Sequence, residues 1–180
     1  MRIDPPPPAA GAARGQPPLF ARFRGALALL LGRRPPLLQV AALCRREGPA
    51  GTEMLLMTSL DTGRWVLPKG WPMRGRSLAG AALREAWEEA GVVGSAAPDP
   101  VGSYLYFKRR TGGYVQRVEV KVFPVRVRRM DKHFPERGRR RLVWLPLAEA
   151  AARVEEEGLR ELLMTLAAPE QPLAGGVVRP

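Results

Sequence analysis

The pattern of apolar and polar positions becomes regular from residue 37 onward. Short runs of apolar and β-branched residues are separated there by turn-forming residues, which is typical of strands joined by tight turns. The pattern predicts strands over Leu37–Arg46, Glu53–Thr58 and Arg64–Leu67. A Gly-Pro-Ala-Gly segment separates the first two strands, and Asp61-Thr62-Gly63 separates the second from the third.

A second alternating region follows later in the chain. Ser103–Lys108 and Tyr114–Val127 alternate between apolar and polar positions and flank Thr111-Gly112-Gly113, which predicts a hairpin. The other predicted elements after this hairpin are one strand and two short helices, over Arg141–Leu145, Leu147–Val154 and Leu159–Ala167.

The N-terminal part of the chain has a different composition. Residues 1–18 are rich in Pro, Ala and Gly, which predicts a disordered tail because little apolar surface is available to bury. Leu19–Arg34 has the spacing of a short basic amphipathic helix, which docks on the domain or on anionic lipid, with docking on the domain favoured. We therefore predict a tail with this helix over 1–36, one folded domain over 37–168 and a flexible tail over 169–180.

Apolar runs and cysteine content bear on location. No apolar run approaches the roughly 20 residues needed to cross a bilayer, so no transmembrane segment is predicted. Ala26–Leu31 is not followed by a small-residue cleavage site, so secretion is not expected. Cys44 is the only cysteine, which fits a reducing cytoplasm and a buried strand position, and His133 is the only histidine. We predict a cytoplasmic location and no zinc site.

A helix is predicted over Leu78–Ala90, with Ser77 as its N-cap and Gly91 at its C-terminal end. At about 100° per residue, Glu85, Glu88 and Glu89 share one arc. The residues of the roughly opposite arc, predicted to pack, are Ala79, Leu83, Ala86, Trp87 and Ala90.

Three carboxylates at this spacing repel one another, and only Arg84, four residues before Glu88, supplies a nearby positive charge on the helix. A divalent cation would resolve the conflict. Mg²⁺ prefers oxygen ligands and binds in phosphate chemistry through a few carboxylates together with substrate oxygens. Without further information, a solvated glutamate face is the simpler interpretation of the helix alone.

The residues around this helix resemble the Nudix box. That motif runs Gly, five residues, Glu, seven residues, then Arg-Glu-aliphatic-any-Glu-Glu-any-Gly-aliphatic. Gly70 and the segment from Arg84 to Val92 fit this frame, and the resemblance extends from about Gln39 to Leu166. Within the family, Arg64–Pro72 and Phe134-Pro135-Glu136 look like bacterial members similar to diphosphoinositol polyphosphate phosphohydrolases.

The resemblance implies an α/β fold, the Nudix-type α/β/α sandwich with a mixed β-sheet and a loop-helix-loop catalytic motif. It also implies roles for the box residues. Glu85 and Glu89 are the principal metal ligands, with Glu88 and Gly70 in the metal-binding set. Glu88 is a ligand or the general base, with Glu85 as the reserve base, and Arg84 holds the carboxylates in place.

The chain departs from the motif at two positions, Arg76 and Ala86, and Lys69 directly before the motif is also unusual. Arg76 occupies the place of the early Glu of the box, so it cannot bind a cation and is predicted either to contact a substrate phosphate or to be solvated. Lys69 stands where many relatives have Gly. It either neutralises substrate charge or merely flanks the box. Ala86 occupies the aliphatic position after Glu85 and is not expected to disturb the motif.

Net charge suggests an anionic partner. The chain carries +12, and residues 101–145 hold 13 Lys and Arg against three acidic residues. Lys108, Arg109 and Arg110 at the hairpin tip are predicted to bind substrate. The other clusters considered are Arg126, Arg128 and Arg129 as a further part of the basic rim, and Arg139–Arg141, which are equally expected to be solvated.

These features predict a Mg²⁺-dependent hydrolase, with Mn²⁺ as a possible substitute, that cleaves a phosphoanhydride bond in a small, highly anionic phosphorylated substrate such as a diphosphoinositol polyphosphate. Dinucleoside polyphosphates, nucleoside diphosphate sugars or RNA 5′ ends are alternative substrates. A different class is a non-catalytic Nudix domain that senses a ligand or binds nucleic acid, which is possible but not favoured. No oligomeric state is predicted.

Overall fold

The structure is a computed structural model of the 180-residue chain, and it describes residues 35–49, 51–109 and 115–168. The helix predicted over Leu19–Arg34, both predicted tails and the turn Thr111-Gly112-Gly113 lie outside these residues. No helix within the described ranges is long and apolar enough to cross a membrane.

The described residues form a mixed sheet of eight strands. Its central order is β3-β2-β1-β7-β5, with β4 also paired to β1, β6 to β7 and β8 to β2. Only β1 and β7 run parallel, which confirms the predicted mixed sheet. The strands are β1 (Leu37–Gly48), β2 (Gly51–Thr58), β3 (Trp65–Val66), β4 (Lys69–Gly70), β5 (Val92–Ala96), β6 (Gly102–Arg109), β7 (Val115–Met130) and β8 (Leu142–Pro146).

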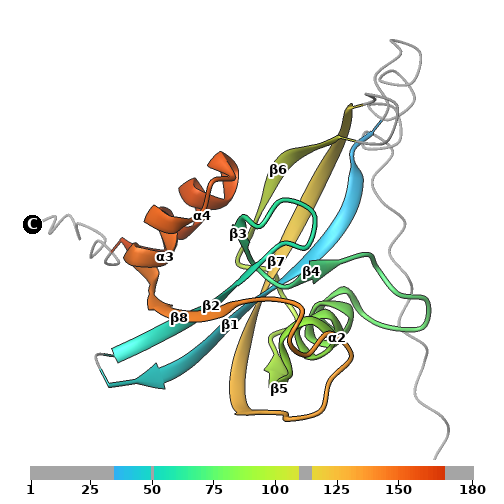
Figure 1. The fold of residues 1–180 in the computed structure, drawn as a ribbon. Helices are drawn as coiled ribbons and strands as arrows, with labels where there is room; N and C mark the ends of the chain where they lie inside the picture. The colour runs from blue at the N-terminus through green and yellow to red at the C-terminus, as the bar shows by residue number, and fades with distance from the viewer. Residues whose placement is uncertain (1–34, 50, 110–114, 169–180) are drawn as a thin grey trace, which may run out of the picture. The chain divides into compact units, whose positions relative to one another are not determined.

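Helices cover both faces of this sheet, as the α/β/α prediction required (Figure 1). The helix α2 (Leu78–Ala90) packs on one face, and α3 (Leu147–Arg153) with α4 (Glu157–Ala167) packs on the other. Because successive side chains of a strand point to opposite faces of the sheet, the core consists of two clusters, one on each face. In β1, Ala42 and Cys44 face α2, whereas Leu43 joins the cluster under α3 and α4. The prediction of a buried Cys44 is confirmed.

The observed elements differ from the predicted ones mainly around the box. The helix α2 has the predicted bounds, but a predicted loop residue pair forms β4, and β5 was not predicted at all. Gly94 and Ser95 interrupt any apolar pattern in β5. A Cβ at Gly94 would overlap the carbonyl oxygen of Arg126 on β7, so close strand pairing explains the glycine. The strand β7 also extends three residues beyond the predicted end at Val127.

The two ends of α2 fix its position beside the sheet. At the N-terminus, the Ser77 hydroxyl accepts a hydrogen bond from the Gly80 amide at 3.0 Å, as predicted for an N-cap. At the C-terminus, Gly91 adopts φ 72°, and a Cβ there would meet the Phe134 ring and the Asp131 carbonyl. The chain therefore passes directly from α2 into β5 while the segment after β7 lies against the turn.

Candidate active site

The three carboxylates of α2 do not share one environment. Glu89 is buried, with 8% of its surface exposed, whereas Glu85 and Glu88 are half-buried. The expectation that one arc presents all three carboxylates outward is therefore wrong for Glu89. Packing follows the small residues of the helix rather than the predicted arc, because the fully buried positions include Ala81 and Ala82, which leaves Leu83 and Trp87 half-buried. Small alanines let the helix approach the sheet closely.

Arginine side chains engage two of these carboxylates. Arg84 Nε donates to Glu88 Oε1 at 2.5 Å, and the Arg84 guanidinium also lies 4.3 Å from the centre of the Trp87 ring. Arg140 Nη2 donates to Glu89 Oε1 at 2.6 Å, and its Nε donates to Glu136 Oε2 at 2.7 Å. The Arg140 side chain is only 9% exposed, so it forms a buried bridge between α2 and the segment after β7.

The backbone before α2 completes the environment of the carboxylates. The amide of Lys69 donates to Glu89 Oε2 at 2.9 Å. At Gly70, a Cβ would overlap the carboxylate of Glu85, so any larger residue there would displace that side chain. The pairing of β4 with Val40 and Ala41 of β1 holds both of these backbone positions in register with α2.

Burial and repulsion between carboxylates disfavour the charged forms of Glu85 and Glu89. Burial raises the pKa of Glu89 to about 7, despite the opposing effects of Arg140 and of the Lys69 amide. Burial, with repulsion from Glu88 and Glu136, also raises the pKa of Glu85. The donor atoms are all carboxylate oxygens, which suits a hard divalent cation. Among the described residues, no group of three Asp, Glu, His or Cys side chains is arranged as it would be around a bound metal ion. Arginine side chains instead form hydrogen bonds with two of the three box carboxylates.

A cavity of about 430 Å³ opens beside Glu89 and Arg140. Lys69 and Lys108 line it, together with Tyr106, whose hydroxyl donates to Gln39 Oε1 at 2.8 Å. The remaining charged lining residues are Asp61, Arg64 and Glu156. The cavity thus combines four cationic and three anionic side chains with apolar ones.

Lys69 is, after Arg140, a second largely buried cation of this cavity. Its side chain is 13% exposed, and its Nζ lies 3.8 Å from Glu156 Oε1 and 5.8 Å from the centre of the Tyr106 ring. Burial lowers the pKa of Lys69, while the carboxylates of Glu156 and Glu89 oppose that shift. Glu156 lies in the short segment that joins α3 to α4, and burial together with the Glu156 carboxylate raises the pKa of the buried Tyr104 hydroxyl. The Lys69 ammonium group therefore lies where it can form an ion pair with a phosphate bound in the cavity.

The comparison with protein families decides the assignment. Residues 36–166 match the model of the NUDIX domain, which is most of the chain. The chain belongs to the Nudix family.

Curated relatives agree with this assignment. The chain is 31% identical over 120 residues to Nudix hydrolase 21, chloroplastic, of Arabidopsis thaliana, which covers 66% of this chain and 59% of the relative. It is 28% identical over 114 residues to Nudix hydrolase 17, mitochondrial, of the same plant, covering 63% and 60%. The match thus spans about three fifths of the length of these relatives.

Solved Nudix structures share the fold at low identity. A C. elegans Ap4A hydrolase superposes with a TM-score of 0.53 at 18% identity, covering 74% of this chain and 97% of that one. The NUDIX domain of Shewanella oneidensis NrtR, complexed with ADP ribose, superposes with a TM-score of 0.54 at 18% identity, covering 79% and 98%. These likenesses support the Nudix fold.

The Nudix fold brings together only some of the residues predicted to bind substrate. Lys69 and Lys108 line the cavity beside Glu89. Arg76 lines a different cavity of about 410 Å³, next to Arg84 and Trp87. The side chain of Arg109 and all of Arg110 lie outside the described residues.

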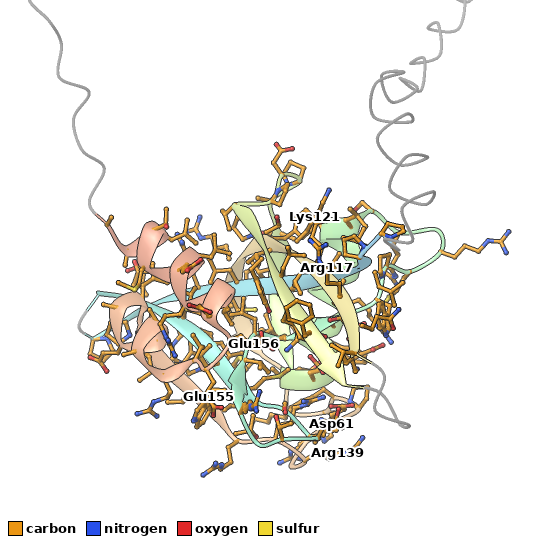
Figure 2. All side chains as sticks on the ribbon, turned by 90° about the horizontal axis from the view of Figure 1, so that it is seen from above. Asp61, Arg117, Lys121, Arg139, Glu155 and Glu156 are labelled. Atoms are coloured by element: carbon orange, nitrogen blue, oxygen red, sulfur yellow. The ribbon has the colours of Figure 1, made fainter. Side chains whose placement is uncertain are left out.

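The other basic residues between positions 101 and 145 do not extend one basic rim from the hairpin tip either. In Figure 2, Arg117 and Lys121 lie on the opposite side of the view from Arg139. The arginines at the end of β7 line a third cavity that shares no described lining residue with the one beside Glu89. The expectation that they extend the basic rim of the hairpin tip is therefore wrong.

Sequence reasoning missed two charged residues of the site. Arg140 belongs to a run of three arginines, and nothing in the spacing singles it out, yet it is the buried one while Arg139 and Arg141 are exposed. Glu136 was noted only for its family likeness. Its position follows from Phe134, which lies against Gly91, and from a hydrogen bond of the Glu136 amide to the Glu88 carbonyl.

The raised pKa of Glu89 predicts a pH-dependent stability of the metal-free protein. Between the ordinary glutamate value of 4.5 and about 7, the folded state retains a proton that the unfolded chain has lost. The free energy of unfolding should therefore fall as pH rises through this window, by up to about 3 kcal/mol from this residue. Urea denaturation in EDTA from pH 4.5 to 7.5 measures it. Glu89→Gln should flatten the slope, and parallel curves for both proteins would contradict the prediction.

Proposed function

We propose that this Nudix chain is a Mg²⁺-dependent hydrolase that cleaves a phosphoanhydride bond in a small phosphorylated substrate. One observation carries the proposal. Glu89, one of the three carboxylates of the box, lines the cavity that also contains Lys69 and Lys108. Hydrolysis of a phosphoanhydride needs cations that neutralise the phosphate oxygens, and it needs a group that accepts a proton from water. The lysines lie beside Glu89, and Glu88 and Glu85, the candidates for the proton acceptor, lie on the same helix as Glu89.

Glu85, Glu88 and Glu89 would hold the Mg²⁺, with Gly70 in the same set because it leaves room for the Glu85 carboxylate. When bound, Mg²⁺ or Mn²⁺ supplies charge neutralisation at the phosphate and orients it. Glu88 accepts the proton from water, with Glu85 as the reserve for that role. Arg84 orients Glu88 through its hydrogen bond, and Arg140 keeps Glu89 and Glu136 in place.

The residues of the cavity favour a nucleoside diphosphate-linked substrate. Four cations against three carboxylates suit a ligand with a few phosphates better than one covered with them. Phe107 and Leu60, 67% and 43% exposed, line the same cavity and offer apolar surface to a base or sugar. The solved neighbours support only the fold, so these side chains carry the choice of substrate.

A denser polyphosphate, such as a diphosphoinositol polyphosphate, is the second candidate. It is supported by the family likeness of residues 64–72 and 134–136 and by Lys69 and Lys108 in the cavity. Arg76, Arg109 and Arg110 would then contribute further charge. The non-catalytic alternative is a Nudix domain that binds a nucleotide without cleaving it, and the absence of any metal-dependent turnover would favour it. A cytoplasmic location stays a prediction.

Hydrolysis itself should depend on the metal and on the charge of Glu89. Purified protein with Mg²⁺ should release product from at least one member of a phosphoanhydride panel, and EDTA should abolish this release. Glu89→Gln keeps the volume but removes a charge, so kcat should fall by roughly two orders of magnitude or more. Glu149→Gln, on the exposed surface of α3, is the matched control and should retain activity. A folded Glu89→Gln protein with normal turnover would refute the metal assignment.

Two substitutions should separate the substrate candidates. Phe107→Ala should raise KM for ADP-ribose several-fold, because base stacking on an aromatic ring contributes roughly 1–3 kcal/mol, but should leave KM for a diphosphoinositol polyphosphate unchanged. Lys108→Gln should raise KM for both substrates with little change in kcat. The wild type should have the higher kcat/KM for ADP-ribose. The opposite preference, with no effect of Phe107→Ala, would favour the dense polyphosphate.

A further inference from the structure

The strands β1 and β7 separate at a pair of arginines. Their parallel pairing ends at Arg45 opposite Arg126. Beyond this pair, β1 continues to Gly48 beside β2, whereas β7 continues to Met130 beside β5 (Figure 1). We call the segments Arg45–Gly48 and Arg126–Met130 the β1–β7 fork.

The fork encloses a cavity with a strong excess of positive charge. Its volume is about 710 Å³, and five arginines line it against one carboxylate, that of Glu47. Glu47 accepts a hydrogen bond from the Thr52 hydroxyl at 3.2 Å. The five arginines are Arg45, Arg46, Arg126, Arg128 and Arg129.

Three of these arginines have no acidic partner among the residues that the structure describes: Arg45, Arg126 and Arg128. By contrast, Arg46 pairs with Glu53 at 2.9 Å, and Arg129 lies 3.9 Å from Asp131. The charges of Arg45, Arg126 and Arg128 are therefore available to a ligand.

The strand geometry forces two of the free arginines together. Leu43 of β1 and Val122 of β7 face the same core cluster, and side chains two residues apart share a face. Arg45 and Arg126 therefore project from the same face on adjacent, paired strands. Like charges directly opposite one another destabilise a sheet, and a bound anion would relieve this repulsion. Arg128 adds a third charge where a register shift in β5 leaves it without a strand partner.

We propose that the β1–β7 fork is a second anion-binding site, separate from the active site, for a small ligand with two or more phosphate groups. One guanidinium group can donate two parallel hydrogen bonds to the oxygens of one phosphate, so several arginines around one cavity suit a ligand with several phosphates. None of the described residues lining the cavity is aromatic, so it offers no stacking platform for nucleic-acid bases. A concave site also suits a small molecule better than a flat membrane surface.

The cavity of the fork is separate from the active-site cavity beside Glu89, and Arg129 of the fork also lines the cavity that contains Arg76 and Arg84. The two cavities share no described lining residue, and Gln39 of the active-site cavity precedes Arg45 by six positions along β1. At about 3.3 Å per residue, this corresponds to roughly 20 Å. A ligand of the fork would therefore not occupy the cavity beside Glu89.

Inositol hexakisphosphate tests the site because it carries phosphate monoesters and no anhydride that the proposed activity could cleave. It is titrated into the ¹⁵N-labelled full chain without metal, followed by amide shifts and by calorimetry. The expected result is saturable shifts at Arg45–Gly48 and Arg126–Met130. The variant Arg45→Gln/Arg126→Gln/Arg128→Gln should bind at least about tenfold more weakly at this site. Arg117→Gln/Lys132→Gln/Arg137→Gln removes the same charge elsewhere and should bind within about threefold of the wild type.

Several outcomes would overturn the proposal. Shifts confined to the cavity beside Glu89, or equal weakening by both triple variants, would reduce the fork to general charge attraction. Tighter binding of an RNA oligonucleotide than of inositol hexakisphosphate at the fork would replace the small ligand by nucleic acid. Fork-dependent binding to vesicles with phosphatidylinositol bisphosphate, without binding of inositol hexakisphosphate, would replace the small ligand by a membrane surface. The wild-type shifts decide the matter even if the triple variant does not fold.

Discussion

The buried carboxylate of Glu89 is the constraint around which the rest of the site is arranged. One of its oxygens accepts from Arg140 and the other from the Lys69 amide. A buried carboxylate is costly unless it is paired, so these two contacts offset part of the cost of burying Glu89. They join three segments that are distant in sequence: the strand before the box, the box helix, and the segment between β7 and β8.

The same arrangement accounts for the division between chemistry and recognition. The acids of α2 are held by Arg84 and Arg140 and by the backbone of a short strand, so their geometry depends on rigid elements. The cationic side chains that would meet the substrate, Lys69 and Lys108, come from β4 and β6 instead. Substitution of the Lys69 and Lys108 side chains can therefore alter substrate binding while the backbone contact of Lys69 with Glu89 is kept.

The sequence predicted the bounds of α2 and both of its caps correctly because local signals determine them: a 3.6-residue period, a serine before the helix and a glycine after it. The mixed sheet followed from the family resemblance. The burial of Glu89 and of Arg140 depends on long-range packing, and no local pattern distinguishes Arg140 from Arg139 or Arg141. Net charge along residues 101–145 was also misleading, because the arginines at the end of β7 line a cavity that is separate from the one beside Glu89.

The central claim is that the carboxylates of α2 bind a divalent cation, and paramagnetic broadening by Mn²⁺ tests it most directly. Mn²⁺ is added in small amounts to the metal-free, ¹⁵N-labelled chain, and the loss of amide signals is mapped. The account predicts that signals of Gly70 and of Glu85–Glu89 broaden first, that excess Mg²⁺ restores them, and that Glu85→Gln/Glu89→Gln removes the effect. Broadening centred on the other acidic cluster, Glu155–Glu157 before and within α4, or broadening unchanged in the double variant, would contradict it.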